Sequence, residues 1–195
     1  MLRLFASLVV VATLCTLVVG CGDDPLQPFA DIRWKLRCQV MGGCTGYMNR
    51  DMNNYNGEEG RKISCQIQSR GGGTNEFFFK AYQGTDYGIE MSNVSYSGTG
   101  GPVGGTCQVR VLEDGSNWTA ACGAGAPSAA QPCQITNFRI DPMLGVVGKV
   151  WCEGLPLYGS PETLRELTSP DEPLPTDHTA ERRGADFNLQ NCAGL

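Results

Sequence analysis

The sequence predicts an all-β fold, an antiparallel β-sandwich of about seven short strands held together by about four disulfide bonds. Short stretches of the chain alternate between apolar and polar residues, as half-buried strands do. The 26 glycines and 11 prolines gather between these stretches, where turns are expected. Of the ten cysteines, two precede residue 22, which leaves an even number for the folded domain. No alternation of strands with helices is visible, so a parallel α/β sheet is not expected.

The first predicted strand starts at Arg33. Even-numbered positions are apolar and odd-numbered positions are polar as far as residue 40, the pattern of a strand with one buried face. Residues 41–60 are rich in glycine and asparagine and are expected to form a loop. Further strands are expected over 62–70, around Phe77-Phe78-Phe79 after the glycines of 71–73, and over 87–96.

The most specific local pattern lies between Cys107 and Cys122. Asp114-Gly115 is a strong signal for a two-residue hairpin turn. A hairpin centred on this turn places the two cysteines opposite each other, and a slip of one residue would destroy that match. The sequence therefore predicts a Cys107–Cys122 disulfide, with an apolar face made of Val109, Val111, Trp118 and Ala120.

A second hairpin is expected from Cys133 to Cys152, with its turn at 141–145. Its ends bring Cys133 and Cys152 near each other, although the apolar phase breaks around Asn137. Eight cysteines allow 105 connectivities, so the pairing of the other four stays open. These four disulfide candidates are Cys38, Cys44, Cys65 and Cys192.

Residues 155–185 contain five prolines and no strand pattern. We expect this segment to be a Pro-rich crossover over the domain, and a disordered linker is the alternative. Within it, Ser160 as N-cap and Pro161 at the first helical position predict one short helix that ends at Leu167. A last strand is expected from Asp186 to Cys192, whose cysteine would fix the end of the chain.

The N-terminal segment has the layout of an export signal. Arg3 is its only charged residue, and an apolar stretch runs from Leu4 to Val19. This stretch is shorter than the roughly 20 residues of a membrane-spanning helix, and no cluster of Lys or Arg follows it. Residues 1–20 are therefore expected to be a cleaved signal peptide.

The end of that stretch, Val18-Val19-Gly20-Cys21, resembles the lipobox of bacterial lipoproteins. The resemblance covers the targeting segment only. It implies cleavage after Gly20 and acylation of Cys21, and a plain secreted protein is the alternative. By the same resemblance, Gly22 after the acylated cysteine implies the outer membrane. Residues 21–31 would then be a lipid-anchored linker and residues 32–195 the domain.

Composition and motifs argue against several classes of function. The formal net charge of −5 argues against nucleic acid as a partner. No CxxC motif occurs, and His178 is the single histidine, so zinc is not expected and disulfides are. His178 stands in the Pro-rich segment, where a catalytic group would be poorly held. We expect no metal, no cofactor and no catalytic residues.

A binding role remains the leading hypothesis. Strand phase places Phe78, Tyr82 and Trp151 on outer faces between charged residues, an arrangement that suits a glycan or protein partner. The competing interpretation is that segment 155–185 covers these rings as a second small core. The sequence thus favours a non-enzymatic structural or binding module on the membrane. An extracytoplasmic glycan hydrolase with paired carboxylates is the alternative.

Overall fold

In the computed structural model, residues 26–38, 48–102, 107–169 and 184–195 are described here. These residues form twelve strands and one short 3-10 helix, η1 (Glu58–Gly60), so the predicted all-β class is confirmed. Nothing in this part of the chain is a helix long and apolar enough to cross a membrane. The strands are β1 (Phe29–Cys38), β2 (Met48–Tyr55), β3 (Arg61–Gly71), β4 (Thr74–Gln83), β5 (Tyr87–Ser97), β6 (Gly100–Pro102), β7 (Cys107–Glu113), β8 (Ser116–Gly123), β9 (Cys133–Asp141), β10 (Gly145–Leu157), β11 (Ser160–Thr168) and β12 (Ala185–Gln190).

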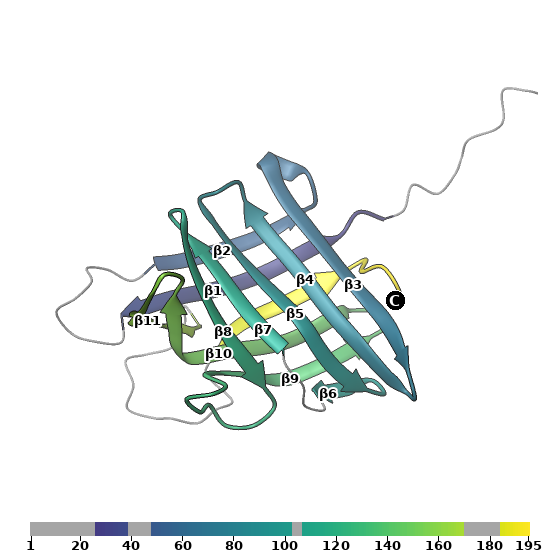
Figure 1. The fold of residues 1–195 in the computed structure, drawn as a ribbon. Helices are drawn as coiled ribbons and strands as arrows, with labels where there is room; N and C mark the ends of the chain where they lie inside the picture. Colours follow the sequence, from purple (N-terminus) through teal and green to yellow (C-terminus); the bar gives the residue numbers. More distant parts are fainter. Residues whose placement is uncertain (1–25, 39–47, 103–106, 170–183) are drawn as a thin grey trace, which may run out of the picture.

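The strands lie in two layers that face each other, as Figure 1 shows. Strands β3, β4, β5, β7 and β8 make the front layer, and β2, β1, β12, β10 and β9 cross behind them. The two layers belong to one hydrogen-bonded sheet, because β6 pairs with both β5 and β9 and β8 pairs with both β7 and β9. The described strands pair antiparallel except for β8 with β9, and an isolated bridge between Gln66 and Ala193 is also parallel.

Aromatic side chains fill the space between the layers. Phe79 of β4 packs against Phe187 of β12, with ring centroids 5.6 Å apart. Phe138 of β9 lies 5.6 Å from Phe77 and 5.2 Å from Tyr96 of the front layer. All five rings are buried. Their burial stabilises the contact between the layers, because each large apolar side chain removed from water contributes about 1.5–3 kcal/mol.

Three disulfides join these strands. The predicted Cys107–Cys122 bond links β7 to β8 with the two Cα atoms 5.0 Å apart, and its register is the one that the Asp114-Gly115 turn predicts. Cys133 and Cys152 pair across β9 and β10, as the second hairpin predicts. The apolar phase breaks at Asn137 because that residue has a φ of 53° beside a bulge in the β9–β10 pairing.

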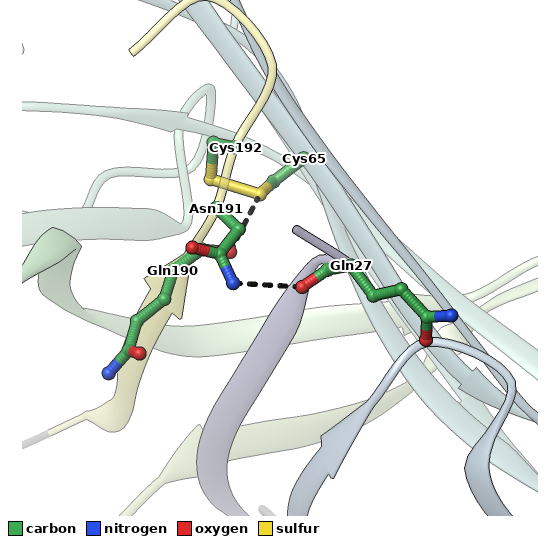
Figure 2. The surroundings of a disulfide bond; sticks show 5 residues. All are labelled: Gln27, Cys65, Gln190, Asn191 and Cys192. Atoms are coloured by element: carbon green, nitrogen blue, oxygen red, sulfur yellow. Dashed lines mark hydrogen bonds between the residues drawn. A yellow bond between two sulfur atoms is a disulfide. The ribbon is translucent and has the colours of Figure 1, made fainter. Parts of the chain in front are cut away.

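The third disulfide joins the two layers at the end of the chain (Figure 2). Cys65 lies on β3, the outermost front strand, and Cys192 follows β12 of the back layer. Beyond this bond, the Ala193 amide donates to the Cys65 carbonyl and the Ile67 amide donates to the Ala193 carbonyl. The C-terminal residues therefore occupy part of the free edge of β3, which would otherwise expose unpaired backbone groups.

The structure corrects the helix predicted from Ser160 to Leu167. These residues form β11, an extended strand that pairs with β1 and β10. Ser160 and Pro161 do match a helix start, but pairing on both sides satisfies more backbone groups than one isolated helical turn. Pro161 is tolerated because it follows a tight turn, at the start of the strand.

The predicted loop 41–60 is also corrected in part. Residues Met48–Tyr55 form β2, an edge strand along β1, although their composition is polar. Asn49, Asp51 and Asn53 alternate with inward-facing residues, so asparagine marks the solvent face rather than a loop. The described residues contain more strands than the sequence suggests, twelve rather than about seven, and several of them are longer than expected. The predicted signal peptide, Cys21, Cys44 and His178 lie outside the described residues.

Strands β11 and β12 together fill one position in the back layer, between β1 and β10. Lys35 of β1 faces Thr168 of β11, and Arg33 faces Asp186 of β12, which leaves Trp34 opposite Ala185. The β10 side agrees, since Val150 faces Ala185 and Cys152 faces Leu167. The in-and-out alternation also continues without a break across this junction. Residues 169–184 are thus an insertion into what is otherwise one strand.

This register makes a deletion prediction. Removing residues 169–184 joins Thr168 to Ala185 and should leave a continuous strand in register with both neighbours. We expect the variant to fold and to gain about 2 kcal/mol in free energy of unfolding, because a 16-residue connection no longer has to be closed. Urea unfolding under oxidising conditions measures the change.

The control is a deletion of residues 169–185, one residue longer. It would turn Asp186 into the core and Phe187 to solvent, and such a slip reverses every side chain of the strand. We expect that variant to be severely destabilised. Equal stability of the two deletions would contradict the assignment of one interrupted strand.

Candidate functional site

The outer face of the back layer carries a polar cavity of about 590 Å³. It lies over β1, β12, β10 and β9, and its lining also includes Phe138 and Phe187, whose rings belong to the aromatic core. Its size falls within the range of small-molecule sites. The outward-pointing side chains of this polar cavity include one apolar residue, Val147, and the polar residues Asp31, Arg33, Arg139, Lys149, Asp186 and Asn188.

Strand pairing arranges these charges in rows across the layer. Arg33 faces Asp186, and Asp186 faces Lys149 on the next strand. The Lys149 ammonium lies 3.1 Å from the Asp186 carboxylate. Asp51 of β2 extends the row beyond Arg33, so charges of opposite sign alternate over four strands. Opposite charges in direct cross-strand pairs stabilise the register.

Two polar groups in the polar cavity are not fully stabilised by contacts with the rest of the described protein. The Asn188 side-chain oxygen Oδ1 is buried and accepts no hydrogen bond from any described residue. Burial also raises the pKa of Asp31, and the nearby carboxylates of Asp51 and Asp186 raise it further while Arg33 lowers it. A buried acceptor without a donor costs about 1–3 kcal/mol unless a ligand or water fills it. The oxygen has less than 1 Å² of exposed surface, so a ligand hydroxyl can donate to it only after a neighbouring side chain moves.

Glu166 of β11 accepts hydrogen bonds from two neighbouring strands on the same outer face. Arg37 of β1 donates to Glu166 Oε2, with 2.9 Å between Nε and the oxygen. The Trp151 indole donates to the other carboxylate oxygen of Glu166 at 3.3 Å. Trp151 therefore lies half-buried on the outer face, two residues along β10 from Lys149. Of the three predicted binding residues, it is the one on the face of the polar cavity.

Tyr82 lies on the opposite side of the molecule, on the outer face of the front layer. Its ring covers Gly88 so closely that a Cβ at that glycine would lie 2.0 Å from a ring carbon. Its hydroxyl donates to Glu90 at 2.7 Å. Burial and this hydrogen bond raise the pKa of Tyr82 above its ordinary value. Tyr82 thus has a packing role within the front layer.

A groove of about 420 Å³ lies beside Tyr82 on the front layer. Its polar groups pair with one another, as Arg110 does with Asn117 at 2.6 Å. Tyr158 stands at its edge with 83% of its surface exposed.

Phe78 lines a third hollow, formed by β3, β4 and both ends of the described chain. Phe78 and Tyr82 share the outer face of β4, as predicted, whereas Trp151 lies on the outer face of the back layer, so the three residues form no common strip. The described residues contain no group of three or more His, Cys, Asp or Glu placed to hold a metal ion.

Comparison with known proteins finds no match: no family model, no curated protein and no solved structure is similar to the chain. The physical properties of these sites are therefore the basis for any functional proposal.

The sequence alone does not predict that most residues of the polar cavity lie together. Alternation of Arg33 with apolar neighbours placed it on an outer face, but nothing local showed that Asp186 and Lys149 would lie beside it. The separation along the chain is about 150 residues for Arg33 and Asp186, and only the strand order brings them together. A signal was present in the alternation of Asp186, Phe187 and Asn188, which marks the polar residues as outward.

The raised pKa of Asp31 predicts a pH-dependent effect on stability. Because folding raises this pKa above the unfolded value of 3.8, ionised Asp31 destabilises the domain at neutral pH. Asp31→Asn should therefore raise the melting temperature slightly at pH 7. The gain should disappear below pH 3.8, where the native carboxyl is also protonated. Calorimetry at pH 7 and pH 3 tests this, and an unchanged or lower melting temperature at pH 7 would contradict it.

Proposed function

We propose that this protein is a lipid-anchored, extracytoplasmic binding module that recognises a hydroxyl-rich glycan in the polar cavity. The unpaired Asn188 oxygen, buried in a cavity between alternating charges, is the observation that supports it most. Sugars present many hydroxyl donors to such an oxygen, and a polar cleft suits them better than an apolar ligand. Half-buried Trp151 on the same face offers an apolar ring surface near the charges.

The compartment follows from the cysteines. Three disulfides in the described residues suggest an oxidising environment outside the cytoplasm. We infer that Cys38 and Cys44, which have five residues between them and are the two left over from the predicted eight, form the fourth disulfide. The two facing layers then make a disulfide-stapled β-sandwich. Acylation of Cys21 would hold this domain on a membrane, and Gly22 favours the outer membrane.

A glycan hydrolase is the second candidate, because Asp31 has a raised pKa and Asp186 lies diagonally across the strand pair from it. Diagonal cross-strand neighbours are about 7–8 Å apart, a separation compatible with an inverting pair of carboxylates. Asp186 is already paired with Lys149, which favours a structural role. Binding therefore remains the leading proposal.

The binding proposal predicts a loss of affinity in Asn188→Ala. Calorimetric titration with a panel of neutral oligosaccharides should identify a ligand of the native protein. Loss of one hydrogen bond should weaken its binding by about 1 kcal/mol, roughly fivefold. Gln190→Ala is the matched control, since Gln190 lies on the same face of β12 outside the cavity lining.

Equal affinity of the native protein and Asn188→Ala would place the ligand elsewhere. Absence of binding to every oligosaccharide would refute the glycan proposal. Shortened sugars after incubation with the native protein, but not with Asp31→Asn, would favour the hydrolase.

The anchoring proposal predicts the mass of the mature protein. Intact-mass spectrometry of protein purified from its host membrane should show loss of residues 1–20, acyl mass on Cys21 and no free thiol before reduction. An unmodified Cys21 would overturn the lipid anchor. Two free thiols would overturn the fourth disulfide.

A further inference from the structure

The exposed apolar side chains are unevenly distributed over the molecule. Among the described residues, the large apolar side chains exposed by more than a third are Leu26, Tyr55, Met143, Leu144, Tyr158, Leu164 and Leu195. Five of these lie at one end of the back layer, as the strand registers show. The other two, Tyr158 and Leu164, lie near the far end of β10 and the start of β11.

Strand ends bring the five together. Phe29, at the start of β1, faces Tyr55 at the end of β2 and Gln190 at the end of β12. On the next strand, Val146 faces Leu189, so the turn that carries Met143 and Leu144 lies at this same end. Figure 1 shows β1 entering and β12 leaving on this side, close to the C-terminus.

The two chain ends lie side by side here. The Asn191 side-chain amide donates to the Gln27 carbonyl at 2.9 Å, as Figure 2 shows. Leu26 and Leu195 then line opposite parts of one hollow of about 760 Å³, together with Phe78. Leu26 is 76% exposed and Leu195 is 53% exposed.

This end is also the one nearest the proposed lipid. Cys21 precedes Leu26 by five residues, a chain that reaches about 17 Å when fully extended. The far end of β10, where Tyr158 stands, is separated from this end by a 13-residue strand, which spans at most about 40 Å. Apolar side chains at the tethered end therefore remain within reach of the bilayer surface, and those at the far end do not.

We propose that the tether end, defined by Leu26, Tyr55, Met143, Leu144 and Leu195, docks into the headgroup–acyl boundary of the membrane. The inference rests on the proposed acylation of Cys21, which keeps this end beside the bilayer. Apolar side chains enter that boundary to a depth of about 5–10 Å, and tyrosine is enriched there. Docking would fix the direction of the domain, with β10 pointing away from the membrane.

The turn at 141–145 is built to expose apolar side chains without exposing unpaired backbone donors. Asp141 Oδ1 accepts hydrogen bonds from the amides of Met143 at 2.8 Å and Leu144 at 3.1 Å. Met143 is 92% exposed and Leu144 is 47% exposed on this fixed turn. Internal satisfaction of the amides lowers the cost of moving the turn out of water.

The test places a fluorescent side chain at each end of the acylated protein. Met143→Trp reports on the tether end, and Tyr158→Trp is the matched control at the far end. Both proteins are purified from the host membrane and reconstituted in neutral phosphatidylcholine vesicles, with or without bromine on the acyl chains. Subtracting the emission of the native protein leaves the signal of the added indole.

In Met143→Trp, bromine should reduce the added emission about twofold or more, because an indole inserted to that depth contacts the acyl chains. In Tyr158→Trp, bromine should reduce the emission no more than it does in the native protein. Unquenched emission in Met143→Trp would overturn the docking surface, provided that intact mass shows acyl on Cys21 in the same sample. Equal quenching at both ends would also overturn it, since no direction would be fixed. A sample without acyl mass would overturn the anchor instead, and with it the premise of docking.

Discussion

The strand position between β1 and β10 is the constraint on which the rest of the structure depends. It is filled end to end by β11 and β12, which the chain supplies from either side of an insertion. Without it, β1 and β2 would have no hydrogen-bonded contact with β10. Phe187, which packs on Phe79 of the front layer, also comes from this position. The Cys65–Cys192 bond then holds its end against the front edge strand.

The proposed site is a consequence of that arrangement. Asp186 and Asn188 reach the outer face only because Phe187 and Leu189 turn inward, and both stand between side chains of β1 and β10. The junction of Thr168 with Ala185 also lies next to the polar cavity, since Asp186 belongs to the cavity lining. A 16-residue connection inside a strand is long for a compact domain, and such segments commonly carry function. The candidate site and the insertion therefore share one origin in the fold.

Local sequence patterns predict the features of the fold that depend on residues close together in the chain. The Asp114-Gly115 turn sets its own register, so Cys107–Cys122 followed from the sequence. The β11 strand did not, because its helix-start residues were outweighed by pairing with partners more than a hundred residues away in the case of β1. The polar cavity was missed for the same reason: Arg33 and Asp186 meet only through strand order. The polar composition of β2 predicts a loop, but an edge strand with a solvated face needs few apolar residues.

Native-state hydrogen exchange tests the central claim most directly, that β11 and β12 act as one strand. Amides of both strands that pair with β1 and β10 should exchange with the same opening free energy, within about 1 kcal/mol and close to that of global unfolding. Exchange of β11 amides through a low-energy local opening, with β12 still protected, would contradict the claim. The two segments would then be separate elements that share a place in the layer without sharing its stability.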